Sequence, residues 1–409
     1  MSPFFGMGHP EAVTLLSSEP LPDLGRMQSE RLMLLQQRMA DQAVAGAVLL
    51  HGPHVAYATG YVTSAVDSTH AVHDRAVAII GAQGPAHLFA NDPPPALIAE
   101  THLPLSPELD ESIPELADAL RMVIDGRDRP RIAIDELTGA MLRSGLFDDF
   151  DTVDASRVLG PARLLKTEDE LACIDRAQRI NEVAMEEVRG FCVPGTRRSQ
   201  LAAVFVNRVR ELGVEDILID PIFQPMPKNR SDPPRTSTGH VAFPTGVGDP
   251  TFAEGDVVWV DTGIDVEGYA SDYGRTWIVG REPNQAERTL FARWAAVMDA
   301  SLRAIRPGAT LAEVARAATK ADGGLRPWLP HFYLSHGVGV ESAEMPMIGT
   351  DLGYSFDENF TLKTGMVLVL EPVTWEDGVG GYRAEEIVAV TEDGWRPLGG
   401  QPGYSPFDT

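Results

Sequence analysis

Residues 254–276 are EGDVVWVDTGIDVEGYASDYGRT, and this stretch decides the fold. Its β-branched and aromatic residues favour two strands, and Gly263 and Gly268 allow the chain to reverse between them. We therefore predict a β-hairpin that carries one aspartate on each strand, Asp261 and Asp272. One interpretation is purely structural, because an aspartate at the end of a strand often serves as a turn former. A buried carboxylate, however, is costly without a partner, so a metal ion, a ligand or an arginine is expected beside these two acids.

The composition indicates a globular protein of two domains. The chain has 409 residues, of which 44% are hydrophobic, so two sizeable cores can form. It contains 34 basic and 59 acidic residues, and the resulting net charge of −25 opposes binding to nucleic acids and to anionic membranes. Most of these acids are expected to form a solvated surface.

The cysteine count and the chain start predict a cytoplasmic protein. Cys173 and Cys192 are too few for a disulfide framework or a thiolate metal site, which fits a reducing compartment. Residues 1–24 are interpreted as an irregular leader, because they lack the basic start and continuous apolar core of a signal peptide. No apolar run approaches the roughly 20 residues of a membrane helix.

Residues 25–160 are predicted to form an α/β domain. Leucines and methionines at helical spacing predict a first helix over 25–45. Short apolar runs divided by Gly and Pro then predict strands. The predicted strands lie in GAVLLHG (46–52), VAYATGY (55–61), AVAIIG (76–81) and RIAIDE (131–136), and the predicted helices at 95–101, 113–124 and 138–145.

Residues 161–409 are predicted to form a second domain with an internal duplication. Thr167 and Glu170 make a capping-box pattern that begins a helix ending near Gly190, and a second helix follows over about 197–212 before the hairpin. After Arg281 the same order returns, with helices at 284–305 and after Thr310. A second hairpin, within 365–390, carries Glu371 and Glu385.

Packing of the two halves about a pseudo-twofold axis would bring four carboxylates into one site. Their repulsion in a partly dry site calls for divalent cations, and two such ions balance four carboxylate charges. His336, in SHGVG, is the candidate neutral ligand because its glycine neighbours allow close backbone approach. Taken singly, His336 could be structural and Glu385 could lie in a solvated turn; the joint occurrence of all five residues favours a metal centre.

The order of these residues resembles the metal-ligand series of the pita-bread metallopeptidases, peptidase family M24, which include creatinase, prolidase, aminopeptidase P and methionine aminopeptidase. The matching motifs are VDTG, SDYGRT, SHGVG, LEP and GYRAEE, and residues 30–61 are similar to the amino-terminal domain of the prolidase-like branch. The resemblance implies a creatinase-like α/β domain followed by a pita-bread domain with pseudo-twofold symmetry.

The resemblance also implies roles for individual residues. The metal ligands would be Asp261, Asp272, His336, Glu371 and Glu385. Asp272 and Glu385 would bridge two divalent ions, and Glu371 would also act as the catalytic proton carrier for a metal-bridged hydroxide that attacks a carbonyl. Arg383 would orient Glu385. Oxygen-rich ligation with one imidazole favours Mn²⁺, with Fe²⁺, Co²⁺ or Zn²⁺ as alternatives.

The substrate side departs from the family pattern. Proline-specific members usually carry a second histidine seven residues after the metal-binding one, and this chain has Ala343 there. His240 resembles the family's other catalytic histidine, although it lies 21 residues before Asp261, farther than usual. His331 and Glu341 are further candidates for substrate contact, with an exposed loop and a strand end as the alternatives.

By the same resemblance the protein is a homodimer in which the amino-terminal domain of one subunit closes the site of its neighbour. The corresponding lid would be YVTSAVDSTHAVHDR (61–75), with His70, His73 and Asp74 as substrate contacts. An ordinary polar loop is the alternative interpretation.

The sequence thus predicts a dinuclear metallohydrolase of the Xaa-Pro peptidase type that acts on a dipeptide or short peptide. Ala343 keeps open an M24 hydrolase or lyase acting on a small non-peptide compound, as creatinase, ectoine hydrolase and dimethylsulfoniopropionate lyase do. The lyase is disfavoured because no additional aspartate follows two residues after the first. A non-enzymatic binding module is disfavoured because all five ligands are present.

Overall fold

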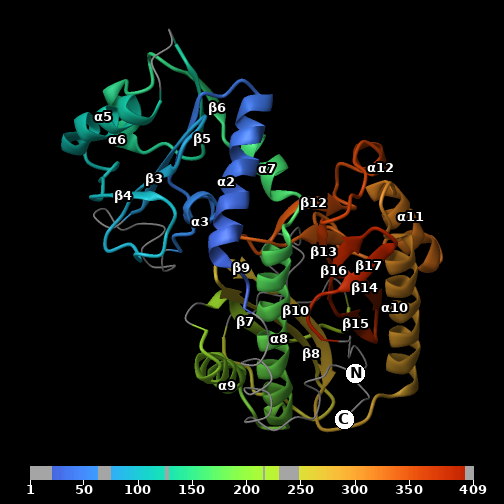
Figure 1. The fold of residues 1–409 in the computed structure, drawn as a ribbon. Helices are drawn as coiled ribbons and strands as arrows, with labels where there is room; N and C mark the ends of the chain where they lie inside the picture. The colour runs from blue at the N-terminus through green and yellow to red at the C-terminus, as the bar shows by residue number, and fades with distance from the viewer. Residues whose placement is uncertain (1–20, 63–74, 125–128, 215–216, 230–247, 401–409) are drawn as a thin grey trace. The chain divides into compact units, whose positions relative to one another are not determined.

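The computed structural model describes residues 21–62, 75–124, 129–214, 217–229 and 248–400 (Figure 1). The chain divides into two compact units. Among the described residues, one unit lies within Leu21–Glu170 and the other within Leu171–Gly400. The long helix α8 (Glu168–Phe191) begins in the first unit and continues through the second.

The first unit is built on a six-stranded mixed sheet in the order β4-β3-β2-β1-β5-β6. The central strands β1 and β2 are antiparallel, whereas β3–β4, β1–β5 and β5–β6 are parallel. The strands are β1 Gly46–Leu49, β2 Val77–Gly81, β3 Ala86–Phe89, β4 Glu100–His102, β5 Arg131–Ile134 and β6 Asp151–Asp154. The helices are α2 Leu24–Asp41, α3 Gly52–Thr59, α5 Ile113–Val123, α6 Gly139–Ser144 and α7 Ser156–Arg163, with a 3₁₀ turn η1 at Asp110–Ser112.

Two predictions for this unit are wrong. VAYATGY forms most of helix α3, not a strand; Pro53 lies in its first turn and Gly60 ends it in the left-handed region at φ 78°. The predicted helix over 95–101 is absent, and β4 begins there at Glu100. That segment begins with the last of three consecutive prolines, at 93–95, and is too short to nucleate a helix alone.

The second unit repeats one order of elements, helix, helix and antiparallel strands, as the sequence predicts. The first half has α8, α9 (Arg198–Glu211) and the strands β7 Ile217–Pro225, β8 Val257–Val266, β9 Tyr269–Ala270 and β10 Tyr273–Ile278. The second half has α10 Gln285–Ala304, α11 Leu311–Ala321, the short α12 Tyr354–Asp357, and β11 Ser335–Gly337, β12 Glu344–Ile348, β13 Val367–Leu370, β14 Val373–Glu376, β15 Gly380–Arg383, β16 Glu386–Thr391 and β17 Gly394–Pro397. These strands form three sheets. The first has the order β10-β8-β7, with β9 also paired to β8; the second has the order β12-β11-β13-β16-β17; the third is the pair β14-β15.

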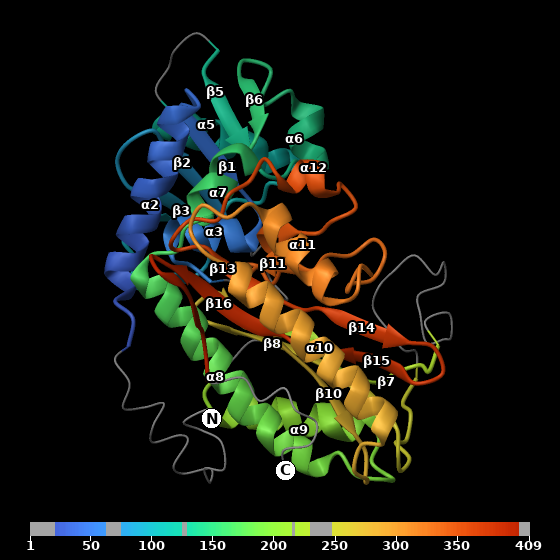
Figure 2. The same cartoon turned by 90° about the vertical axis from the view of Figure 1, so that its right-hand side faces the viewer.

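Helices cover these sheets from outside. Figure 2 shows α8 and α10 lying along the strands, and α10 packs against α11, β14 and β15 while α9 packs against β7. The two predicted capping pairs, Thr167 with Glu170 and Thr310 with Glu313, are confirmed. Helix α10 begins with a further pair that was not predicted, Asn284 with Glu287.

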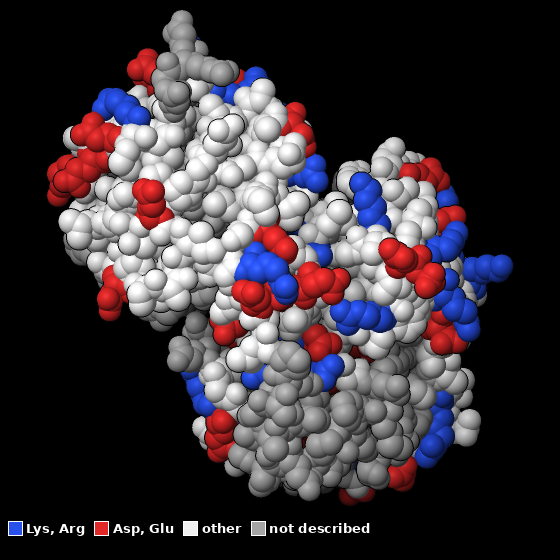
Figure 3. All heavy atoms as spheres, viewed as in Figure 1, with Lys and Arg blue, Asp and Glu red and all other residues white. Residues whose placement is uncertain are grey.

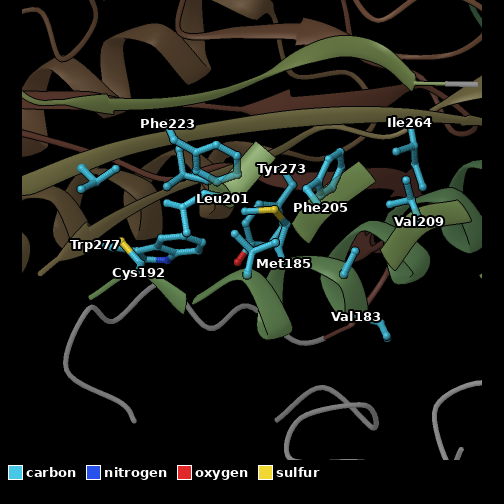
Figure 4. Packing of buried hydrophobic residues seen from close by; sticks show 14 of the residues in the cluster. Val183, Met185, Cys192, Leu201, Phe205, Val209, Phe223, Ile264, Tyr273 and Trp277 are labelled. Carbon is cyan, nitrogen blue, oxygen red and sulfur yellow. The ribbon is translucent and has the colours of Figure 1, made fainter. Parts of the chain in front are cut away.

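The core under the first half joins α8 and α9 to the β7-β8-β10 sheet. In Figure 4, Met185 from α8 and Leu201 and Phe205 from α9 point toward Phe223 on β7 and Trp277 on β10. All five side chains are buried, and apolar burial of this kind stabilises by about 25 cal/mol per Å². This core fixes the outer side of the hairpin that carries Asp261 and Asp272.

On the face seen in Figure 3, acidic and basic side chains are interspersed within each unit, and the basic ones form no continuous stripe among the residues drawn there in colour. Across the described parts of the chain, we find no helix with the length and apolarity needed to span a bilayer.

Candidate functional site

The predicted hairpin over 254–276 is confirmed. Strand β8 pairs with β10 in antiparallel register, with Asp261 opposite Gly274, and Asp272 stands directly before β10. The chain reverses at Glu267 and Gly268, where φ is 55° and 80°. Gly263, which was expected in the turn, lies inside β8 instead. Asp261 on one strand therefore faces Gly274, which is two residues from Asp272 on the other strand. Both aspartates are buried.

The second pair of acids lies where a longer hairpin is interrupted. Strands β13 and β16 pair with each other, β14 pairs with β15, and Glu371 and Glu385 occupy the two breaks between them. Pro372 has no N–H to continue the ladder beyond Glu371. The Glu385 N–H donates to the Gly274 carbonyl at 3.0 Å, which joins this hairpin to the first.

His336 on β11 completes the group. Its Nδ1 lies 2.8 Å from the Gly337 carbonyl, so Nδ1–H donates there and leaves the Nε2 lone pair available. Nε2 is 3.3 Å from Asp272 Oδ2 and 3.4 Å from Glu371 Oε1. Burial lowers the pKa of His336, but Asp272 and Glu371 raise it more, so its net shift is upward. The five residues predicted as ligands therefore converge in one buried place.

Arg383 holds three of the four carboxylates. Its Nη1 lies 3.0 Å from Asp261 Oδ2, its Nη2 lies 2.7 Å from Glu371 Oε2, and Nη2 also contacts Glu385 Oε1. The sequence predicted contact with Glu385 alone. Burial raises the pKa of both Asp261 and Glu371, and Arg383 opposes that rise in each.

The geometry suits divalent cations. One guanidinium cannot satisfy four buried acids, and Asp261 Oδ1, Glu371 Oε1 and Glu385 Oε2 are buried with no hydrogen-bond partner among the described residues. Asp261, Asp272 and Glu385 each offer an oxygen within 4.8 Å of the other two. Unpaired buried oxygens this close together are the chemistry of a multivalent cation site.

Two side chains of α8 support the first hairpin, and sequence analysis missed both. The Asn181 amide donates to the Thr262 carbonyl at 2.9 Å and to Ser271 Oγ at 3.0 Å, and it accepts from the Thr262 hydroxyl at 2.9 Å. Gln178 Oε1 accepts from the Asp272 N–H at 3.2 Å. Their available signal was polar residues three positions apart on an otherwise apolar helix face.

Tyr333 was also missed. Its ring meets the His336 ring edge-on at 5.1 Å, and it stacks on Phe332 at 4.1 Å. Burial, and after it the charges of Glu371 and Asp272, raise the pKa of Tyr333, so its phenol stays a neutral donor at ordinary pH.

The structure does not place every predicted substrate residue at the centre. His331 is on the surface, with Nδ1 2.6 Å from Asp351 Oδ2, and Ala343 is exposed. Glu341 is half-buried and lies three residues before Glu344, the buried first residue of β12. The residues His70, His73, Asp74 and His240 lie outside the described residues, so their predicted roles stay predictions, as does the homodimer.

Comparison with known proteins agrees with this geometry. Residues 172–392, more than half of the chain, match the model of metallopeptidase family M24. Over 246 residues the chain is 31% identical to the Xaa-Pro dipeptidase of Pyrococcus furiosus, covering 59% of this chain and 64%, just under two thirds, of that protein. It is 27% identical over 385 residues to a probable dipeptidase PepE of Mycobacterium tuberculosis, covering 90% and 92% of the two chains.

Solved structures share the fold. A dipeptidase from Pyrococcus horikoshii OT3 superposes with a TM-score of 0.70 at 23% identity over 90% of this chain and 97% of its own. Dipeptidase PepE from Mycobacterium ulcerans gives 0.70 at 23% identity over 94% and 98%. The predicted mixed α/β architecture with a pita-bread domain is thereby confirmed.

Proposed function

Because the chain belongs to metallopeptidase family M24, we propose that it is a dinuclear metal-dependent peptidase of the Xaa-Pro type. The observation that carries this proposal is the convergence of Asp261, Asp272, His336, Glu371 and Glu385 in one buried place, with three of their oxygens unpartnered among the described residues. The substrate class follows the relatives, which are named Xaa-Pro dipeptidase and dipeptidase.

The same five residues would hold the metal ions. Their donor set, carboxylate oxygens with one imidazole, favours Mn²⁺, with Fe²⁺, Co²⁺ or Zn²⁺ as alternatives. When bound, two divalent ions supply Lewis-acid polarisation of the substrate carbonyl and activation of the attacking water. Asp272 and Glu385, one from each hairpin, would both help to hold these ions, and the hydrogen bond from the Glu385 N–H to the Gly274 carbonyl ties the two hairpins together two residues from Asp272.

Glu371 is the proposed proton carrier. Arg383 contacts its Oε2 and so fixes the carboxylate, while Oε1 has no hydrogen-bond partner in the described structure. Oε1 can therefore accept a proton from the attacking water and deliver it to the departing amine.

Tyr333 is proposed to supply a hydrogen bond that Ala343 cannot. A methyl group has no donor, and Ala343 is exposed. The Tyr333 ring packs edge-on against the ring of the proposed ligand His336, and its phenol remains protonated. Its hydroxyl can donate to the substrate carbonyl as negative charge develops there.

The first test is metal content together with activity. The wild-type chain, Asp272→Asn and the surface control Asp351→Asn are stripped with chelator, reloaded with Mn²⁺ and measured for bound metal and hydrolysis of Xaa-Pro dipeptides. Loss of both properties in Asp272→Asn alone supports the proposal. Full activity of the stripped wild type in excess chelator overturns it.

The second test addresses the substrate, because Ala343 favours one other candidate, a hydrolase or lyase of small non-peptide compounds. The Mn²⁺-loaded chain is offered Xaa-Pro dipeptides, other dipeptides, longer Xaa-Pro peptides, and small amidine and betaine compounds. Turnover confined to the non-peptide compounds rejects the peptidase, whereas preference for dipeptides with a prolyl bond supports it.

A further inference from the structure

A second group of metal-binding side chains lies at the edge of the sheet in the Leu21–Glu170 unit. His87 comes from β3, and Glu100 and His102 come from the three-residue edge strand β4. β3 and β4 are parallel, with His87 opposite Glu100 and Phe89 opposite His102. Because residues two apart on a strand share a face, all three side chains lie on the same side of the sheet.

The donor atoms are already close to the spacing of a tetrahedral ion. His87 Nδ1 is 3.0 Å from His102 Nε2 and 3.6 Å from Glu100 Oε2, and one ligand atom of each residue lies within 4.8 Å of the other two. Atoms bound at about 2.0–2.2 Å to tetrahedral zinc are roughly 3.3–3.6 Å apart. Small rotations of the side chains would therefore satisfy the coordination geometry.

The surroundings hold the imidazoles in place. The His102 ring stacks on Phe89 at 4.6 Å with a 20° interplanar angle, and Phe89 belongs to the buried core of this unit. Both histidines are half-buried. Burial lowers the pKa of His87, and neutral imidazole is the form that binds metal.

We propose that His87, Glu100 and His102 bind one Zn²⁺ ion that ties the edge strand β4 to β3. Two imidazoles and one carboxylate are a ligand set that zinc takes, and the exposed Glu100 side leaves a fourth position for water. A three-residue edge strand has few backbone hydrogen bonds, so an ion across the pair stabilises it against fraying and against pairing with another chain. The alternative is that the two histidines form only a hydrogen bond.

The test counts zinc in the full-length chain. Wild type, His102→Ala and Thr101→Ala are stripped with chelator, equilibrated with Zn²⁺, desalted and measured for zinc per chain. Thr101 lies on the same strand but on its opposite face, so it is the matched control. We expect one zinc fewer in His102→Ala than in wild type or Thr101→Ala. This difference does not depend on how many ions the carboxylate centre holds, so the peptidase proposal can fail without affecting it.

A milder variant guards against misfolding of His102→Ala. Glu100→Gln keeps both imidazoles and their contact with Phe89, and we expect it to weaken zinc binding at this site tenfold or more. Zinc should also slow amide hydrogen exchange in residues 86–89 and 100–102 of wild type and of Thr101→Ala only. Equal zinc content in wild type and His102→Ala, or unchanged zinc affinity in Glu100→Gln, overturns the proposal.

Discussion

Gly274 lies directly against the Glu385 carboxylate. A β-carbon at residue 274 would stand 2.5 Å from Cδ and 2.7 Å from Oε2 of Glu385, and 2.8 Å from Nη1 of Arg383. The two hairpins can therefore approach each other only because residue 274 has no side chain. The strand that presents Asp272 is thus held at contact distance from a proposed ligand on the other hairpin.

Gly274→Ala is expected to displace Glu385 and Arg383, and so to lower metal affinity and kcat/KM by about 10–100-fold. Overpacking of this kind costs about 1–3 kcal/mol in the free energy of unfolding. Gly190→Ala is the matched control, since a β-carbon at this helical position meets nothing within 4 Å. Metal titration and steady-state kinetics check the result; wild-type metal affinity in Gly274→Ala would contradict the tight approach.

Arg383→Met should destabilise the metal-free protein strongly. It removes a guanidinium that contacts Asp261, Glu371 and Glu385 together, and breaking a buried charge group of this kind costs about 3–5 kcal/mol. Denaturant unfolding in chelator measures this loss, and added Mn²⁺ should restore more stability to the variant than to wild type. The exposed Arg303→Met should change the free energy of unfolding by about 0.5 kcal/mol or less. Equal stability of Arg383→Met and wild type in chelator would disprove the clamping role.

Asn181→Ala tests the support that α8 gives to the hairpin. It removes three hydrogen bonds and leaves the buried Thr262 hydroxyl and carbonyl short of a partner, so we expect a loss of about 2–4 kcal/mol in the free energy of unfolding. Glu186→Ala, at an exposed position of the same helix, is the control and should stay within about 0.5 kcal/mol of wild type. A small effect at Asn181 would show that water replaces these contacts.

The features that sequence predicted are those with a strong local signal. The hairpin over 254–276 has runs of β-branched residues and a glycine where the chain reverses. The starts of helices are predicted by capping pairs such as Thr310 with Glu313. The convergence of Asp261 and Glu385 was predicted because the duplication implies a symmetric pairing of halves. Short apolar runs do not distinguish a strand from a helix. Residues 55–61 are too few to show a helical or a strand period, and residues 55–59 belong to helix α3.

The remaining site residues depend on tertiary contacts that no local pattern encodes. Arg383 was predicted beside Glu385, but its contacts with Asp261 and Glu371, which join the two hairpins, were not. Asn181 donates to the Thr262 carbonyl, 81 positions away. Tyr333 has no motif; only the fold places its ring on His336. Sequence therefore identified the charged residues of the centre, and the structure added the neutral ones that position them.

Tyr333→Phe should lower kcat and leave the fold intact. The substitution removes only the hydroxyl and keeps the ring contacts with His336 and Phe332, so stability should change little. Removing one donor to a developing negative charge lowers kcat by about 100–1,000-fold when the donor is fully engaged. We expect the decrease in kcat for Tyr333→Phe to lie at or below that range. Tyr354→Phe is the control, because its hydroxyl contacts Thr319 Oγ1 at 3.0 Å on α11. A kcat equal to that of wild type would remove Tyr333 from the reaction.

The last prediction concerns acid stability of the Leu21–Glu170 unit. The Asp169 carboxylate, 6% exposed, accepts from Arg26 Nε at 2.6 Å and Nη2 at 2.8 Å, and from the Asp23 N–H at 2.9 Å. The Arg26 hydrogen bonds hold the pKa of Asp169 below its usual value. A carboxyl whose folded-state pKa is lowered adds stability that is complete above its unfolded pKa of about 3.9 and is lost as pH falls through the folded value.

Asp169→Asn should therefore cost about 1–2 kcal/mol near neutral pH, a figure reduced because Arg26 is 57% exposed. The difference from wild type should begin to shrink as the pH falls below the unfolded-state pKa of about 3.9, and it should be smallest below the lower folded-state pKa, where Asp169 is protonated in both states. Urea unfolding from about pH 3 to about pH 7 measures this difference in the free energy of unfolding. Following amide hydrogen exchange in α2 reports the unfolding of the Leu21–Glu170 unit specifically. Asp41→Asn, an exposed partner of Arg38 at the end of α2, should show a much smaller difference. A loss in Asp169→Asn that stays constant across the pH range would mean that the carboxylate charge does not stabilise this unit.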